Sequence, residues 1–150
     1  MKKIILVGGG YNFSEINPII KSLKNGKKYK IAGILDDDKK FFKKNYKGLP
    51  FYVGLETASK FKDHEFIFAI SSYKYSHNRE KIFKKMNIDK KKFPNIVHKS
   101  VILEDDVKIG YGNIIYPYSI VCSKTIIKDF CTITHHSILA HNVELNSFSV

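Results

Sequence analysis

The sequence has little of the chemistry on which several classes of protein depend. Of its 26 basic residues, one is an arginine, Arg79. Because readout of base edges relies on the planar arginine fork, we expect no nucleic-acid partner. The two cysteines, Cys122 and Cys131, belong to no CxxC or Cys/His pattern, so we expect free thiols in a cytoplasmic protein. The longest apolar runs, 4–7 and 66–70, are too short to cross a bilayer, so we expect no membrane insertion.

What the chain does contain favours a folded protein of one ordinary domain or two small ones. Hydrophobic residues make up 43% of the 150 residues and aromatic residues 13%, which suffices for a packed core. The formal net charge of +12 has two interpretations. The abundance of Lys, Ile, Asn, Phe and Tyr is typical of an AT-rich genome, and a positive field would also gather phosphate-bearing substrates. Both interpretations stay open.

Aliphatic residues recur with a strict period of six in the second half of the chain. Nine positions follow this register: Val97, Leu103, Ile109, Ile115, Val121, Ile127, Ile133, Leu139 and Leu145. Two residues before each of the last eight lies a second register of small or β-branched residues: Val101, Val107, Asn113, Ser119, Thr125, Cys131, Ser137 and Val143. The two registers keep their phase to the end of the sequence.

This period predicts a parallel β-helix over residues 95–150. A helix would repeat every 3.6 residues and an amphipathic strand every 2, so neither explains a period of six. In a β-helix each hexad forms a short strand and a corner, and three hexads close one triangular coil around the aliphatic side chains. Nine hexads therefore predict about three coils. Because the pattern is still running at Val150, we expect that the sequence is truncated and that the natural protein continues.

Three of the six histidines, His135, His136 and His141, fall within seven positions. Residues that stack on one side of a three-sided coil are 18 positions apart, and 18 residues before His141 the chain has Ser123. No set of metal ligands therefore converges within one chain, and we predict no metal site. Each histidine is considered singly, either as part of a site or as a polar residue at a solvated corner.

The first half predicts a small Rossmann-like α/β domain over residues 1–94. Strand–helix–strand alternation is typical of a parallel sheet. The expected elements are strands over 2–10, 29–38 and 64–71 and amphipathic helices over 12–25 and 76–87. The polar segment 89–95 predicts the joint between the two domains, with the boundary near residue 94.

A glycine turn follows the first expected strand. Gly8, Gly9 and Gly10 precede a helix, where free backbone N–H groups suit a phosphate. The third glycine of the dinucleotide motif is missing, so a plain tight turn is an equal alternative and an NAD-dependent enzyme is disfavoured. Asp36 and Asp37, at the end of the second strand, would bind a ribose or base edge, or would simply form a solvated turn.

The whole chain resembles the bacterial sugar acetyltransferases that include sialic-acid O-acetyltransferases and UDP-amino-sugar N-acetyltransferases. The hexads and one histidine segment are the specific part of this resemblance. The residues that carry it are VGGG at 7–10, LDDD at 35–38, FAIS at 68–71 followed by Arg79, VHKS at 97–100 and SILAHNVEL at 137–145. The resemblance implies an α/β Rossmann-like domain joined to a left-handed hexapeptide-repeat β-helix.

The resemblance also implies acetyl transfer from acetyl-CoA to a sugar or nucleotide-sugar hydroxyl or amine. His141 falls at the position of the family's catalytic base, beside Asn142. An imidazole titrates near neutrality, and a positioned general base gives ~10²–10⁴ in rate. A homotrimer would hold CoA between adjacent β-helices. The acceptor would contact Gly8, Gly9, Gly10, Asn12, Asp36, Asp37, Arg79 and His136.

Two departures from the family pattern concern the site itself. The family commonly has Asp or Glu after its histidine, whereas Asn142 can bind the ring but cannot stabilise an imidazolium by charge. The family also places a histidine after the glycines, where this chain has Asn12. The alternative function is therefore a non-catalytic nucleotide-sugar-binding or scaffold protein. In that case Arg79 would cover a helix face and the histidines would fill solvated corners.

Overall fold

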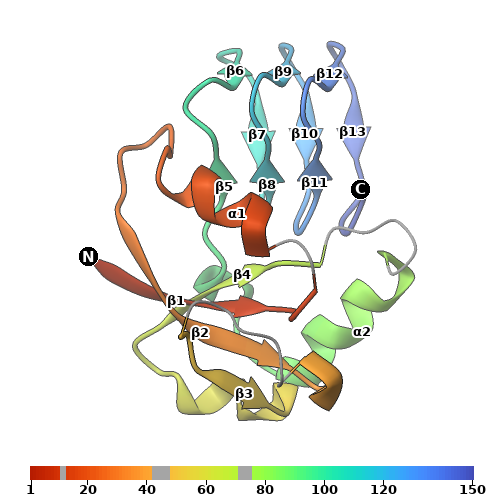
Figure 1. Ribbon diagram of the computed structural model, residues 1–150. Helices are drawn as coiled ribbons and strands as arrows, with labels where there is room; N and C mark the ends of the chain where they lie inside the picture. The colour runs from red at the N-terminus through yellow and green to blue at the C-terminus, as the bar shows by residue number, and fades with distance from the viewer. Residues whose placement is uncertain (11–12, 42–47, 71–75) are drawn as a thin grey trace.

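The computed structural model describes residues 1–10, 13–41, 48–70 and 76–150. Over these ranges a small α/β layer is followed by a three-sided stack of short strands (Figure 1). Asn12, which the sequence nominates as an acceptor contact, lies outside the described residues.

The α/β layer contains one parallel sheet with the strand order β3 (Phe51–Val53), β2 (Tyr29–Asp36), β1 (Lys2–Val7), β4 (Glu65–Phe68). Residues 4–7 of β1 are all buried, because helices and turns cover both faces of a parallel sheet. Side chains alternate between the faces, so Ile4 and Leu6 pack on one side and Ile5 and Val7 on the other. The predicted strands are confirmed, and β3 is an edge strand that was not predicted from the sequence.

Two helices accompany the sheet, α1 (Phe13–Ile20) and α2 (Ser76–Met86), with short 3₁₀ turns at 39–41, 55–60 and 90–92. Helix α1 is shorter than the predicted 12–25 because the chain after it turns to meet the first coil. Lys24 N donates to Val97 O at 2.8 Å, and Leu23 forms an antiparallel bridge with His98. Tertiary contacts thus replace the last predicted helical turn.

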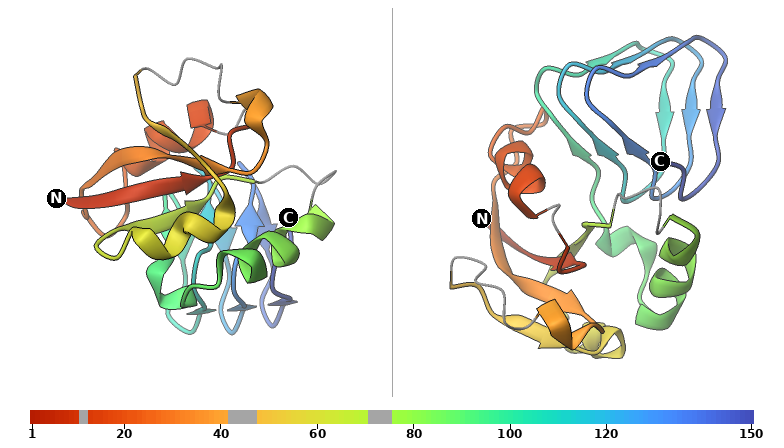
Figure 2. Two further views of the ribbon diagram at one scale, coloured as in Figure 1. Left: turned by 90° about the horizontal axis from the view of Figure 1, so that it is seen from below. Right: turned by 45° about the vertical axis from the view of Figure 1, so that its right-hand side comes forward.

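The second half is a left-handed parallel β-helix of three coils. Its nine strands contain two residues each and form three parallel sheets, which Figure 2 shows as a triangular stack. In chain order they are β5 (Ile96–Val97), β6 (Ile102–Leu103), β7 (Lys108–Ile109), β8 (Ile114–Ile115), β9 (Ile120–Val121), β10 (Ile126–Ile127), β11 (Thr132–Ile133), β12 (Ile138–Leu139) and β13 (Glu144–Leu145). The period-of-six prediction is confirmed.

Both hexad registers point inward for identifiable reasons. The aliphatic residue of each strand belongs to the interior cluster, in which Ile115, Val121 and Ile127 are fully or almost fully buried. A buried aliphatic side chain contributes about 1.5–3 kcal/mol. The small register includes polar members because their hydroxyls donate to carbonyls of the next coil. Ser119 Oγ donates to a carbonyl 15 residues ahead at 2.8 Å, and Thr125 Oγ1 does the same at 3.0 Å.

Every corner from Gly112 onward uses a left-handed residue. Positive φ values recur at Gly112, Tyr118, Lys124, Phe130, His136, Asn142 and Phe148, again six residues apart. Glycine and asparagine adopt this conformation at low cost, whereas bulky side chains do so with strain. A glycine or asparagine at a corner therefore lowers the backbone strain of the turn. A bulky residue keeps that strain and places its side chain at the corner.

The two halves of the chain share an aromatic core. The rings of Phe130 and Phe148, from corners one coil apart, stack with centroids 5.0 Å apart and an interplanar angle of 9°. Phe130 also lies 4.6 Å from Phe83 of α2 and 5.0 Å from Phe93. One face of the sheet and one corner of the β-helix thus share a hydrophobic cluster. This packing fixes the corner relative to the α/β layer.

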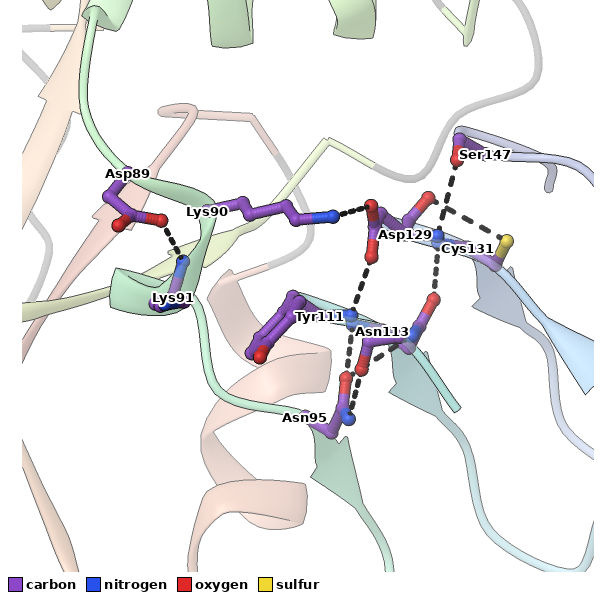
Figure 3. A network of polar contacts seen from close by, with 10 residues as sticks. Asp89, Lys90, Lys91, Asn95, Tyr111, Asn113, Asp129, Cys131 and Ser147 are labelled. Carbon is purple, nitrogen blue, oxygen red and sulfur yellow. Dashed lines mark hydrogen bonds and ion pairs between the residues drawn. The ribbon is translucent and has the colours of Figure 1, made fainter. Parts of the chain in front are cut away.

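The predicted joint over 89–95 is bound to the β-helix rather than free (Figure 3). Lys90 Nζ contacts Asp129 Oδ2 at 2.8 Å. Asn95 Oδ1 accepts from the backbone N–H of Asn113 at 2.9 Å and from its side-chain amide at 3.2 Å. The joint therefore holds the α/β layer against the first two coils.

Candidate functional site

The glycine turn at the end of β1 is tightly determined by its surroundings. Gly8 has a φ of 109°, and its N–H donates to Leu35 O at 2.9 Å. A Cβ at Gly8 would lie 2.6 Å from Ile70 Cγ1, so only glycine fits. At Gly10 a Cβ would meet nothing within 4 Å, which leaves open space beside the turn. The glycines thus combine one strained position with one accessible position.

The two aspartates at the end of β2 hold this turn. Asp36 Oδ2 accepts from Gly9 N at 2.6 Å, and its Oδ1 accepts from the N–H two residues ahead at 2.9 Å. Asp37 Oδ1 accepts from Leu55 N at 2.8 Å, and its other oxygen pairs with Lys85. Both carboxylates thus already have protein partners, and exposed Asp37 is the one accessible to a ligand.

The sheet topology places this turn at a switch point. β1 pairs with β2 on one side and with β4 on the other, so the connections run in opposite directions from β1. In open α/β sheets, ligands bind outside the carboxyl ends of the strands at such a point. The region formed by Gly8, Gly9, Gly10 and Asp37 is called the switch-point edge below.

Arg79 does not lie at this edge, and neither role considered from the sequence describes it. The side chain is fully buried between α2 and the β-helix. Nη2 donates to Phe130 O at 2.7 Å and to Thr132 Oγ1 at 3.2 Å, while Nη1 donates to Phe148 O at 3.2 Å and Ser149 O at 3.4 Å. Burial lowers the pKa of Arg79 to about 10. The residue ties the two halves together, and it is neither an exposed charge nor a free phosphate ligand.

His141 and Asn142 form the turn between β12 and β13, and both are exposed. Asn142 adopts the left-handed conformation with φ 60°, which asparagine tolerates well. Its side-chain amide lies 2.8 Å from His141 Nδ1. The contact between these two residues that the sequence allowed is therefore present, and it leaves Nε2 of the ring facing outward from the pair.

The orientation of the Asn142 amide decides what His141 can do. Amide nitrogen and oxygen occupy equivalent positions, so the same contact fits two arrangements. With the NH₂ group toward Nδ1, the neutral ring carries its proton on Nε2. With Oδ1 toward an Nδ1–H group, Nε2 has a free lone pair and can accept a proton. The structure places Asn142 Nδ2 at His141 Nδ1, which is the first arrangement, so a general base at Nε2 requires the amide to turn over.

The corner of the β-helix that carries His141 in the third coil carries acidic residues in the first coil. Glu104, Asp105, Asp106 and Ser123 line a surface hollow of about 410 Å³. Corners in successive coils are about 4.8 Å apart, which places these carboxylates about 10 Å from the His141 turn. They can shape the field around the histidine, but they do not orient its ring.

A second hollow of about 320 Å³ lies over the outer face of β7 and β10, with Lys108, Gly110, Ile126 and Lys128 among its lining residues. This face adjoins the His141 turn through β13. His141 lines neither hollow. Neither of these two hollows therefore forms a cleft around His141 within one chain.

The other two predicted histidines lie at a different corner. The His135 ring is 4.7 Å from Tyr116, and the His136 ring is stacked on Tyr118 at 5.2 Å. Neither tyrosine was predicted from the sequence. The 18-residue stacking distance could have found the second pair, because Tyr118 lies one coil before His136. It places Pro117 one coil before His135, so Tyr116 is offset from that column by one residue.

The predicted site residues are not brought together in one chain. The turn between β12 and β13 lies at the end of the β-helix away from the sheet, whereas the switch-point edge belongs to the sheet (Figures 1 and 2). His141 and Asn142 form one group, and Gly8, Gly9, Gly10, Asp36 and Asp37 form another. The two groups therefore lie on different parts of the molecule.

Over 1–10, 13–41, 48–70 and 76–150, no three His, Cys, Asp or Glu side chains gather as metal ligands would. In the same ranges, no helix has the length and apolar character needed to cross a membrane. Cys122 and Cys131 are free thiols. The Cys131 thiol is buried, which raises its pKa.

A Rossmann-like layer followed by a left-handed β-helix is the architecture of hexapeptide-repeat sugar acetyltransferases, and the fold predicted from that resemblance is confirmed. Comparison with solved structures gives particular examples. The acetyltransferase domain of PglB from Neisseria gonorrhoeae superposes with a TM-score of 0.70 at 14% identity, over 99% of this chain and 69% of that one. The same domain has been solved with acetyl coenzyme A, with a TM-score of 0.70.

PerB from Caulobacter crescentus, in complex with CoA and GDP-perosamine, superposes with a TM-score of 0.75 at 18% identity, over 99% of this chain and 67% of that one. Variants of that perosamine N-acetyltransferase with one histidine replaced superpose with TM-scores of 0.70. No protein-family model matches the chain, and no curated protein matches it by sequence. At these identities the likeness shows the fold.

Proposed function

We propose that the chain transfers an acetyl group from acetyl-CoA to a sugar or nucleotide sugar, with His141 as general base. The observation that carries the proposal is the exposed imidazole held by Asn142 at a β-helix corner, in a fold shared with enzymes solved with acetyl-CoA, CoA and GDP-perosamine. The acceptor site is the switch-point edge, with Asn12 as a further contact and with Asp36 supporting the edge through its bond to Gly9 N.

The chemistry requires two proton transfers through one base and no covalent enzyme intermediate. The acceptor amine or hydroxyl attacks the thioester carbonyl carbon, His141 Nε2 takes the proton from the attacking atom, and the C–S bond then breaks. The proton passes to the departing thiolate, so CoA leaves as a thiol and the base is restored. A backbone N–H near the corner would stabilise the oxyanion. Lys108, on the adjoining face, offers positive charge to the phosphates of CoA, whereas Lys128 on the same face already pairs with Glu144 at 2.6 Å.

A homotrimer would bring the two separated groups of site residues together, and the chain offers one face for this contact. Ile102, Ile120 and Ile138 are in register on the outer side of β6, β9 and β12. Ile102 is 55% exposed and Ile138 is 69% exposed. Burying each would contribute about 1.5–3 kcal/mol. The His141 turn borders this face, so a neighbouring copy packed there would lie against the histidine.

Replacing Ile138 by lysine should therefore convert the assembly into monomers, because it places a charge in the middle of an aliphatic contact. Sedimentation velocity measures the change. Ile126, outward on the neighbouring face and 38% exposed, is the matched control, and its lysine variant should sediment as the wild-type protein does. A monomeric wild-type protein, or an Ile138→Lys variant that keeps the wild-type size, would contradict this choice of face.

A second candidate function is non-catalytic binding of a nucleotide sugar. One observation favours it: Asn142 brings no charge to support an imidazolium. An assay of thiol release from acetyl-CoA, run over a panel of UDP- and GDP-linked amino sugars and sialic acids, separates the candidates. Acceptor-dependent thiol release supports the transferase. Binding of a nucleotide sugar without thiol release supports the second candidate and rejects the first.

A further inference from the structure

Tyr118 and His136 form an exposed aromatic pair at the corner that precedes β9 and β12. Both residues are left-handed, with φ values of 62° and 57°. Their rings lie 5.2 Å apart at an interplanar angle of 17°, which is a stacked arrangement. Tyr118 nevertheless keeps 62% of its surface exposed. The acetyl-transfer proposal makes no use of Tyr118.

The neighbouring corner shows what such a pair does in this chain. Phe130 and Phe148 have the same place in the hexad, the same left-handed backbone and the same ring stacking. There the pair packs against Phe83 and Phe93 of the α/β layer. A bulky left-handed residue costs about 1–3 kcal/mol, which this packing offsets. Among the described residues, exposed Tyr118 has no comparable packing. Lys124 is also left-handed and exposed, so the backbone conformation alone does not require a partner; the feature particular to Tyr118 is a broad aromatic surface left open to solvent.

The column of residues at this corner carries a ring in two of its three coils. In the third coil the column holds His136, in the second Tyr118, and in the first the small Ser100. Ser100 Oγ accepts from Tyr118 N at 2.9 Å and lies 2.7 Å from His98 Nδ1, so its side chain is engaged with its neighbours. The side of Tyr118 that points toward the first coil therefore lies next to a serine. The opposite side lies next to the His136 ring of the third coil.

The charge of the corner selects an anion. The turns 98–100, 116–118 and 134–136 contain three histidines and Lys99 but no carboxylate. Lys24 reaches the same place, with its Nζ 2.8 Å from Val101 O. A second copy of the chain, with a formal net charge of +12, would add positive charge here, whereas a phosphorylated ligand would neutralise it.

We propose that this corner binds the nucleobase of a phosphorylated nucleotide, with the base stacked on the exposed ring of Tyr118 and the phosphate beside Lys99. Stacking tolerates any base, because every base has a π-face. Two sources share this chemistry: the nucleoside diphosphate of a sugar donor or acceptor, and the adenosine bisphosphate part of CoA. The proposal concerns binding alone and holds whether or not the chain transfers acetyl groups.

Isothermal titration with UDP, GDP and adenosine 3′,5′-bisphosphate tests the proposal and separates the two sources. Tyr118→Ala should weaken binding of the preferred nucleotide by at least ~5-fold, since stacking on an aromatic ring contributes about 1–3 kcal/mol per base. Tyr118→Phe keeps the ring and should bind as the wild-type protein does. Tyr111→Ala, which removes another exposed tyrosine at a different corner, is the matched control and should also leave affinity unchanged.

A second variant distinguishes a blocked site from a misfolded protein. Ser100→Phe adds a third ring to this column, next to Tyr118, and should block the nucleotide while the thermal unfolding curve stays cooperative. Equal affinities for wild-type protein and Tyr118→Ala would overturn the proposal. So would affinity that appears only with oligonucleotides and grows with their length, because that behaviour belongs to a nucleic-acid surface. Nucleotide binding without thiol release in the acetyl-CoA assay would reject the transferase and leave this proposal standing.

Discussion

Arg79→Ala should lower the free energy of unfolding by about 2–4 kcal/mol. The substitution removes hydrogen bonds from a charged donor, each contributing about 1.5–3 kcal/mol, and leaves the buried Phe130 carbonyl without its 2.7 Å partner. Relief from burying a guanidinium without a counter-ion offsets part of this loss. Equilibrium unfolding in urea measures the difference.

Two variants on the same helix sharpen this result. Lys81 is exposed on α2, and Lys81→Ala should change stability by less than about 0.5 kcal/mol. Arg79→Lys keeps the charge but loses the planar fork that reaches two carbonyls at once, so it should fall between wild type and Arg79→Ala. If Arg79→Ala unfolds at the same urea concentration as Lys81→Ala, the proposed tie between the two halves is wrong.

The second large effect concerns the rate of acetyl transfer. His141→Ala should reduce turnover by ~10²–10⁴-fold, because the acceptor proton loses its positioned base. The fold should survive, since His141 is exposed and the left-handed turn depends on Asn142 rather than on the histidine. Initial rates of thiol release with saturating acetyl-CoA give the comparison.

His77 on α2 supplies the matched histidine control, because it is also exposed but lies far along the chain from the β-helix. His77→Ala should keep the wild-type rate. Asn142→Asp should keep the turn and place a carboxylate beside the ring, so its rate should equal or exceed that of the wild-type protein. Turnover by His141→Ala at the wild-type rate would remove the histidine from the mechanism.

The β-helix was predictable from the sequence because its constraints repeat. Each strand places one aliphatic side chain inside, so a single rule acts nine times and leaves a pattern that no helix or ordinary strand produces. The inward turn of Ser119 and Thr125 also follows the predicted register. The strands of the α/β layer were visible as buried apolar runs, as in residues 4–7.

Features that depend on contacts between distant segments were not predictable in the same way. The single arginine gave no sign that it would bind carbonyls some 50–70 residues away, since its local pattern is that of an amphipathic helix. Strand β3 contains three residues and owes its existence to pairing with β2. Helix α1 ends early because Leu23 meets His98.

The candidate site was predictable only in part, for a related reason. His141 stands out through its place in the hexads and its resemblance to a known segment. Periodicity fixed which corner the histidine occupies, but not that this corner lies away from the switch-point edge of the same chain. That separation follows from how the first coil packs on α1 and how the second and third coils pack on α2, through side chains from both halves.

Acetyl transfer by this chain is tested most directly by the mass of a nucleotide-linked amino sugar after incubation with acetyl-CoA and the purified protein. We expect one added acetyl group on the sugar, formed in step with CoA thiol and lost in His141→Ala. An unmodified acceptor across the whole panel, or an acetylated one formed equally well by His141→Ala, would contradict the proposed function.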